Sequence, residues 1–131
     1  MLIFGTTVIG ARDIRRATAF WAGALGLTAG DPFGGNGFTN LYLPDGRPLL
    51  SIQQSDHDAQ VEPRMHLDLY ARDSDDQAAE IERLVGLGAR RVPWDRYPDD
   101  SDFVVLADTE GNLFCVVDNA AAPEQARLDL P

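Results

Sequence analysis

The hydrophobic positions of this 131-residue chain show β-rich runs and one stretch of helical spacing, in an order that occurs twice along the chain. Apolar and β-branched residues dominate 2–9, which predicts a strand, and apolar side chains then recur at helical spacing from Ile14 to Leu25. Asp13 is placed to cap that helix and Gly26 to end it. Three further strands are predicted by short β-rich runs at 27–32, 38–43 and 48–54.

The second half of the chain repeats this order. Alternating character predicts a strand at 65–70, and Asp73 or Ser74 then caps a helix that Gly86 and Gly88 end. The last two strands are joined by the turn Asp-Thr-Glu-Gly-Asn at 108–112, because Asp and Asn bond locally and Gly supplies positive φ. The remaining strands of this half are predicted at 89–92, 103–107 and 113–117.

The two halves also match residue by residue. The triplet Ala11-Arg12-Asp13 recurs as Ala71-Arg72-Asp73, an offset of 73 − 13 = 60. We therefore predict one α+β domain of two βαβββ modules, module one at 1–54 and module two at 64–118, with a polar linker at 55–63. A single helix on a curved sheet cannot close a core, so we expect the sheets to form a paired curved-sheet cleft. The tail at 119–131 is either loose or a subunit contact.

Composition narrows the classes of partner. The chain carries 21 acids and 11 bases, a net charge of −10, which argues against nucleic acid and anionic membranes. No apolar run approaches the length of about 18 residues that spans a bilayer, and the first residues lack the regions of a signal peptide. A cytoplasmic location is expected. The single cysteine, Cys115, excludes an intrachain disulfide.

Several motifs carry a resemblance to a known superfamily. They are Phe20-Trp21 with Leu25-Gly26-Leu27 at the first helix, and Asp-Thr-Glu-Gly-Asn-Leu-Phe at 108–114. With the repeated element order, they resemble the vicinal oxygen chelate superfamily, which includes glyoxalase I, bleomycin-resistance proteins and extradiol dioxygenases, and most of all its glyoxalase-like domains of unassigned activity. Thr109 replaces the usual Pro. The resemblance implies a homodimer, for which we expect edge strands rich in Val and Leu.

The resemblance also implies where a metal would bind. Enzymes of the superfamily hold a divalent metal with one side chain from the first strand and one from the last strand of each module, usually His and Glu. Of the four ligand positions, only the first strand of module two keeps such a residue, His66. Its counterpart in module one, at 66 − 60 = 6, is Thr6. The last-strand positions fall on Cys115 in module two and on Ser51 or Gln53 in module one. These residues suit Ni²⁺, Fe²⁺ or Mn²⁺ poorly, so we expect no cofactor. Zinc held by His66 and Cys115 is the alternative.

Three residues are candidates for catalysis. His66 is either a metal ligand or general base, or a hydrogen-bonded cavity residue without such a role. Asp68 shares its face of the strand and is either a base or acceptor in the cavity, or a solvent-facing or Arg-paired residue. Cys115 is either a small buried hydrophobe or a pocket thiol with a lowered pKa.

Aromatic residues supply the remaining pocket candidates. Trp94 and Tyr97 lie on a Pro-bracketed loop at 93–102, which could close over a flat ligand, and Phe103 follows it. Two functions remain open. The first is a metal-free protein that binds a small organic molecule, in the manner of drug-sequestering members, where acidic charge would favour cationic drugs. The second is a lyase, isomerase or dioxygenase-like enzyme that uses His66, with or without a divalent metal.

Overall fold

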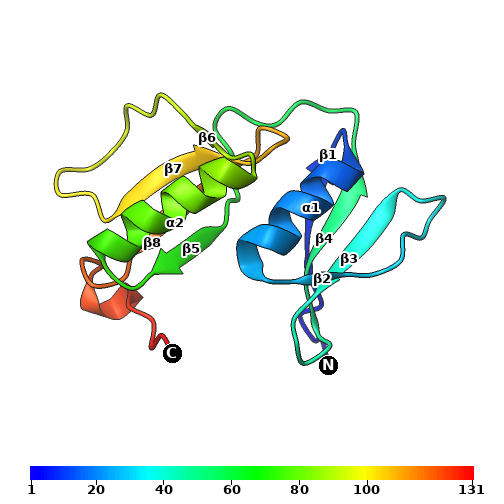
Figure 1. Cartoon of the computed structure of the whole chain (residues 1–131), viewed down its shortest axis with the longest axis horizontal. Coiled ribbons are helices and arrows are strands. Elements are labelled where there is room, and N and C mark those ends of the chain that lie inside the picture. Colours follow the sequence, from blue (N-terminus) through cyan, green and yellow to red (C-terminus); the bar gives the residue numbers. More distant parts are fainter. The chain divides into compact units, whose positions relative to one another are not determined.

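The computed structural model describes residues 1–131 and divides the chain into two compact units, Met1–Ala59 and Gln60–Pro131. Each unit contains one helix and one four-stranded sheet in the order βαβββ (Figure 1). Unit 1 comprises β1 (Thr7–Ala11), α1 (Ile14–Leu25), β2 (Thr28–Ala29), β3 (Phe38–Tyr42) and β4 (Pro48–Gln54). Unit 2 comprises β5 (Asp68–Ala71), α2 (Ser74–Leu87), β6 (Arg90–Arg91), β7 (Phe103–Ala107) and β8 (Leu113–Asp118).

The two sheets share one topology. Unit 1 has the strand order β1-β4-β3-β2 and unit 2 the order β5-β8-β7-β6. In each, the first and last strands run parallel and the other pairs are antiparallel. The predicted α+β fold of two βαβββ modules is confirmed. The pairing of the two sheets around a shared cleft stays a prediction.

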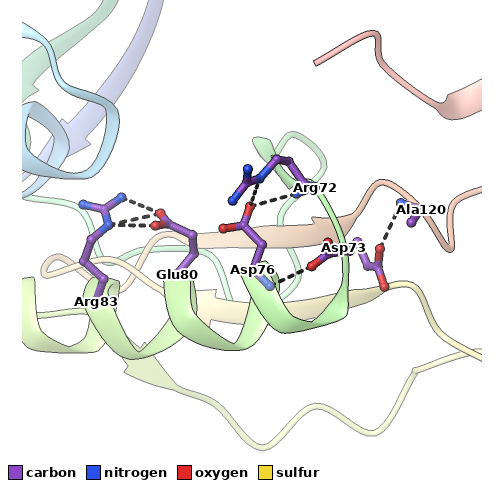
Figure 2. A network of polar contacts seen from close by, with 7 residues as sticks. Arg72, Asp73, Asp76, Glu80, Arg83 and Ala120 are labelled. Carbon is purple, nitrogen blue, oxygen red and sulfur yellow. Dashed lines mark hydrogen bonds and ion pairs between the residues drawn. The ribbon is translucent and has the colours of Figure 1, made fainter. Parts of the chain in front are cut away.

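Capping residues fix both helices where the sequence placed them. The carboxylate of Asp13 accepts the N–H of Arg16 at 3.0 Å, and that of Asp73 accepts the N–H of Asp76 at 2.9 Å (Figure 2). Gly26 ends α1 with a φ of 64°, in the left-handed region that favours glycine. In unit 2 the corresponding residue is Gly88; Gly86 was also expected to end the helix but lies inside α2.

Some strand limits differ from those predicted. The first strand begins at Thr7 instead of residue 2, and the apolar residues Leu2, Ile3 and Phe4 are exposed ahead of it. The strand predicted at 65–70 begins only at Asp68, so His66 precedes it. Two of the four edge strands, β2 and β6, contain only two residues each, Thr-Ala and Arg-Arg, and not the Val and Leu expected for a dimer contact. The homodimer stays a prediction.

The hairpin motif at 108–112 has a structural role. Asp108 is fully buried, and its Oδ1 accepts the N–H groups of Glu110 and Asn112 at 2.9 Å each. Gly111 has a φ of 88°, which the tight turn requires. These bonds satisfy a buried carboxylate and hold β7 and β8 together, the two strands on which much of the site is built.

Each face of the second sheet has its own packing partner. Helix α2 contributes the buried Ile81 and Leu84 to one face, where it contacts β5 and β8 (Figure 1). Val105, Cys115 and Val117 form a separate cluster with Ala122 of the C-terminal segment. The partly buried side chains that pack against this second cluster are Tyr70, Val92, Trp94, Phe103 and Leu113.

One of the two expectations for the C-terminal segment was a loose tail, but the segment is held by burial and hydrogen bonds. Ala122 is 1% exposed, and Asn119 and Leu128 exchange two hydrogen bonds of 2.9 and 2.8 Å. A short 3-10 helix, η1 (Glu124–Ala126), lies between them, next to the end of β5 (Figure 1). The segment therefore packs on its own unit. No helix of the chain is both long and apolar enough to cross a membrane.

Candidate functional site

Unit 2 contains a pocket of about 520 Å³ on the sheet face that carries the Val105 cluster. This volume lies in the range of small-molecule sites, about 300–1,000 Å³. Its wall is mostly apolar and aromatic, with a few polar groups. The residues that line it are Glu62, Pro63, His66, Asp68, Tyr70, Trp94, Arg96, Asp102, Phe103, Val105, Leu113, Phe114, Cys115, Val117 and Ala126.

Sheet register explains why these side chains meet. In one row across three neighbouring strands, Cys115 of β8 pairs with Asp68 of β5 on one side and with Val105 of β7 on the other. Two residues along, Val117 pairs with Tyr70 and Phe103 in the same way. Side chains two residues apart on a strand share a face. Two rows of three side chains therefore form the floor of the pocket.

A polar cluster occupies one part of this floor. Donor atoms of His66, Asp68 and Cys115 all lie within 4.8 Å of one another. Nε2 of His66 lies 3.0 Å from Oδ1 of Asp68, and the carboxylate of Asp68 is also the hydrogen-bond partner of the Cys115 thiol. The three catalytic candidates are thus brought together, with Asp68 as the common partner of the other two.

The surroundings of Cys115 keep its thiol neutral. The pKa of Cys115 is raised to about 12. Burial is the largest cause, and the negative charge of Asp68, its hydrogen bond with the thiol and the negative charge of Asp102 raise the pKa further. A nucleophilic cysteine needs the opposite, a thiolate stabilised near neutral pH. In the protein without metal, the interpretation of Cys115 as an activated thiol is therefore wrong, and its role is that of a hydrogen-bond donor in an apolar wall.

Asp102 is a second acid of the pocket that the sequence analysis did not single out. Its carbonyl accepts hydrogen bonds from Gln77 Nε2 at 3.2 Å and from the N–H of Asp118 at 2.6 Å, so α2 and β8 fix its position. No hydrogen bond or ion pair engages its carboxylate. Because its charge acts on the same thiol as that of Asp68, the floor of the pocket has a negative potential.

The loop at 93–102 contributes part of the wall. Trp94 lines the pocket, and the guanidinium of Arg96 lies 5.7 Å from the centre of its ring. Arg96 also pairs with Glu62, and this pairing lowers the pKa of Glu62. Tyr97 does not line the pocket: its hydroxyl accepts the N–H of Val105 at 2.8 Å, and its ring lies 5.4 Å from that of Phe103.

The candidate residues of module one belong to unit 1, and none of them lines this pocket. Thr6 Oγ1 and Ser51 Oγ are 2.9 Å apart, and Ser51 Oγ donates to Asn40 Oδ1 at 2.6 Å. Val8 is the repeat mate of Asp68 (68 − 60 = 8). Val8 pairs with Ser51 in the first sheet, and Asp68 pairs with Cys115 in the second. Ser51 is therefore the counterpart of Cys115. Gln53 is exposed on β4 and has no such role.

Several lining residues were missed by sequence reasoning. Tyr70, Val105 and Val117 could have been found from strand alternation once Asp68 and Cys115 were aligned. Glu62, Arg96 and Ala126 lie outside regular strands, and no periodic signal marks them.

Comparison with known proteins identifies the family. Residues 6–117 match the family model described as a glyoxalase-like domain. The chain belongs to the glyoxalase-like domain family. The resemblance to the glyoxalase, bleomycin-resistance and dioxygenase superfamily is thereby confirmed. A search of proteins with curated function finds no match.

Solved structures show the same fold at low sequence identity. A possible glyoxalase from Bacillus cereus has 16% identity and a TM-score of 0.65, covering 89% of this chain and 99% of that one. A fosfomycin resistance protein from Listeria monocytogenes, complexed with Mn(II) and 1S,2S-dihydroxypropylphosphonic acid, has 17% identity and a TM-score of 0.68, covering 98% and 97%. Lactoylglutathione lyase from Agrobacterium tumefaciens has 18% identity and a TM-score of 0.59, covering 88% and 92%. These similarities concern the fold alone.

Proposed function

We propose that this glyoxalase-like protein binds a small organic molecule in the pocket of unit 2, and that binding needs no metal. The observation that supports this most directly is the pocket itself, about 520 Å³ in volume with a largely apolar and aromatic wall. Trp94, Phe103 and Tyr70 present ring surface to the cavity. Such walls bind flat or apolar ligands, because transfer of apolar surface out of water is favourable.

The charges of the pocket favour a positively charged ligand. Asp68 and Asp102 both line the pocket, whereas Arg96 is already paired with Glu62. A cationic group near the two aspartates would gain Coulomb energy that a neutral molecule of the same shape would not gain. The ligand class that fits is therefore an organic cation with an apolar body.

The polar cluster supports binding without metal. His66 and Cys115 both use Asp68 as hydrogen-bond partner, so the three side chains satisfy one another. The Mn(II) of the Listeria fosfomycin protein belongs to that protein. Mn²⁺ favours oxygen ligands, and this cluster offers one carboxylate, one imidazole and one thiol.

A dye titration tests the proposal. N-methylacridinium and neutral acridine have nearly the same shape and differ in charge, and both are fluorescent. Added to EDTA-treated protein at neutral pH, N-methylacridinium should bind saturably and more tightly than acridine. The variant Leu113→Trp places a larger side chain in the pocket and should abolish binding, whereas Leu87→Trp, on an exposed position of α2, should not.

Two results would contradict the proposal. One is that neither dye binds until a divalent metal is added. The other is that Leu113→Trp and Leu87→Trp bind with the same affinity as the unaltered protein, which would place the dye elsewhere. Equal affinity for the two dyes would retain the pocket but overturn the preference for cations.

A second candidate is an enzyme of the lyase, isomerase or dioxygenase-like type. The three donors within 4.8 Å favour it, since an imidazole, a carboxylate and a thiol form a donor set suited to zinc. His66, Asp68 and Cys115 would hold the ion, which when bound would act as a Lewis acid on a substrate oxygen. Without metal, Asp68 would orient His66 as a general base. Zinc bound stoichiometrically to protein purified without an affinity tag, and lost in His66→Ala, would favour the metal-dependent form.

A further inference from the structure

We propose that the C-terminal segment 123–131 is a hinged wall of the pocket that opens to let the ligand enter and leave. This inference rests on the proposed binding function for its purpose. The hinge and its motion are argued from the segment's own contacts. Ala126, in the middle of the segment, lines the pocket, and Tyr70 of the pocket floor donates its hydroxyl hydrogen bond to the Ala126 carbonyl at 3.1 Å.

The chain just before the segment is firmly anchored. Ala122 is buried in the same cluster as Val105 and Cys115, and its N–H donates to the carbonyl of Asp118 at 3.0 Å. The carboxylate of Asp118 also accepts the N–H groups of Ala120 and Ala121 at 2.9 and 3.2 Å. The hinge therefore lies immediately after Ala122, where these contacts end.

The segment itself is attached by a small number of polar contacts. Asn119 exchanges two hydrogen bonds with Leu128, and Arg127 Nε donates to the Ala122 carbonyl at 2.8 Å. Most of its side chains are exposed, and Leu130 is its one partly buried apolar residue, so little apolar burial opposes its release. Segments held by solvent-exposed hydrogen bonds open at a lower free energy than the strands of the core.

Opening of this wall would expose the pocket from the side of Tyr70. If the ligand makes few contacts with the segment, weakening the closed state raises the rates of association and dissociation together and leaves the equilibrium constant little changed. A side chain that only stabilised the fold would not produce this pattern. The closed wall would also limit the access of other reagents to Cys115 on the floor of the same pocket.

The test uses two variants that loosen the segment from outside the pocket, Asn119→Ala and Arg127→Ala, with Glu80→Ala as the control. Glu80 forms an exposed ion pair with Arg83 on α2 (Figure 2), so its loss removes a comparable surface contact elsewhere. The N–H of Leu128 donates to Asn119, which precedes the hinge, so its hydrogen exchange reports opening of the segment wherever Asn119 is kept. Stopped-flow mixing with N-methylacridinium and alkylation of Cys115 by iodoacetamide report access to the pocket.

Arg127→Ala should accelerate amide exchange at Leu128 by roughly fivefold, as expected for one lost hydrogen bond. In Asn119→Ala and, to a smaller extent, in Arg127→Ala, both dye rate constants and the alkylation rate should rise in parallel, and in Glu80→Ala they should stay unchanged. Unchanged exchange at Leu128 in Arg127→Ala, or unchanged alkylation in both loosened variants, would overturn the inference. If no dye binds even to the unaltered protein, the proposed function fails, and exchange and alkylation still decide whether the wall opens.

Discussion

Cys115 should contribute a measurable part of this protein's loss of stability at alkaline pH. The thiol of an unfolded chain titrates near its ordinary value of 9.0, whereas burial, Asp68 and Asp102 raise the pKa of the folded thiol to about 12. Between these values the unfolded state releases a proton that the folded state keeps. The stability supplied by the neutral thiol is therefore complete below 9.0 and is lost as the pH rises toward the folded pKa.

The magnitude follows from the size of the shift. Each pH unit within this window costs about 1.4 kcal/mol, so at about pH 10.5 the loss is about 2 kcal/mol relative to about pH 8. The figure applies to a buried group, and Cys115 is 8% exposed. Alkaline pH also acts on other parts of the protein, so the effect of Cys115 must be isolated with a variant.

Cys115→Ser provides that comparison, because serine keeps a hydrogen-bond donor for Asp68 and does not titrate in this range. The free energy of unfolding in urea is measured for both proteins across the pH window, and the difference between them isolates the thiol. The ultraviolet absorbance of the thiolate gives the pKa directly, since Cys115 is the only cysteine. Asp68→Asn should lower this pKa only in part, because burial is its largest cause and remains.

A thiolate that appears at or below the ordinary pKa of 9.0 would refute the reasoning. So would a difference in stability between the two proteins that does not change with pH. Either result would mean that the pocket floor is wetter or less negative than the structure indicates. A thiolate already formed at neutral pH would point instead to a bound metal, which deprotonates a coordinating thiol outright.

Three further predictions concern single sites. Trp94→Ala should lower the free energy of unfolding by only about 1–2 kcal/mol, since the ring is partly buried. Trp21→Ala, in the core of unit 1, should lower the free energy of unfolding by ~3–5 kcal/mol. The affinity for N-methylacridinium should fall roughly tenfold in Trp94→Ala and stay unchanged in Trp21→Ala. Metal analysis of protein purified without a tag should find well below stoichiometric Zn, Ni, Fe or Mn, and a zinc-induced rise in melting temperature that His66→Ala abolishes would contradict this. Asp108→Ala should destabilise the protein by about 3 kcal/mol, because it leaves two partly buried N–H groups without an acceptor. Urea unfolding of Asp45→Ala, at the exposed turn of module one, should change little.

Local chemistry made most of the fold predictable from the sequence. Capping by Asp13 and Asp73 and the left-handed glycines Gly26 and Gly88 act within one turn of a helix, so the residues themselves mark the ends. The repeat offset then linked the two halves. Strand limits were less predictable, since the β-rich run that begins at Leu2 is regular only from Thr7, where pairing with β4 starts.

The candidate site was predicted where strand alternation or the family resemblance marks its residues. His66 and Asp68 were expected to meet because they are two residues apart, and the resemblance placed Cys115 at the same site. The register of β5 and β8 shows how Cys115 reaches Asp68. The ion pair between Glu62 and Arg96 joins positions 34 residues apart with no regular element to relate them. A contact of this kind depends on tertiary packing, and the sequence pattern carries no signal for it.

An NMR titration decides whether the pocket of unit 2 binds an organic molecule without metal. Protein labelled with ¹⁵N is treated with EDTA and titrated with N-methylacridinium. We expect saturable shifts at the amides of Asp68, Phe103 and Cys115, with little change at those of Thr39 and Ile52 in unit 1. Shifts that are absent in EDTA and develop only after zinc is added would contradict this expectation.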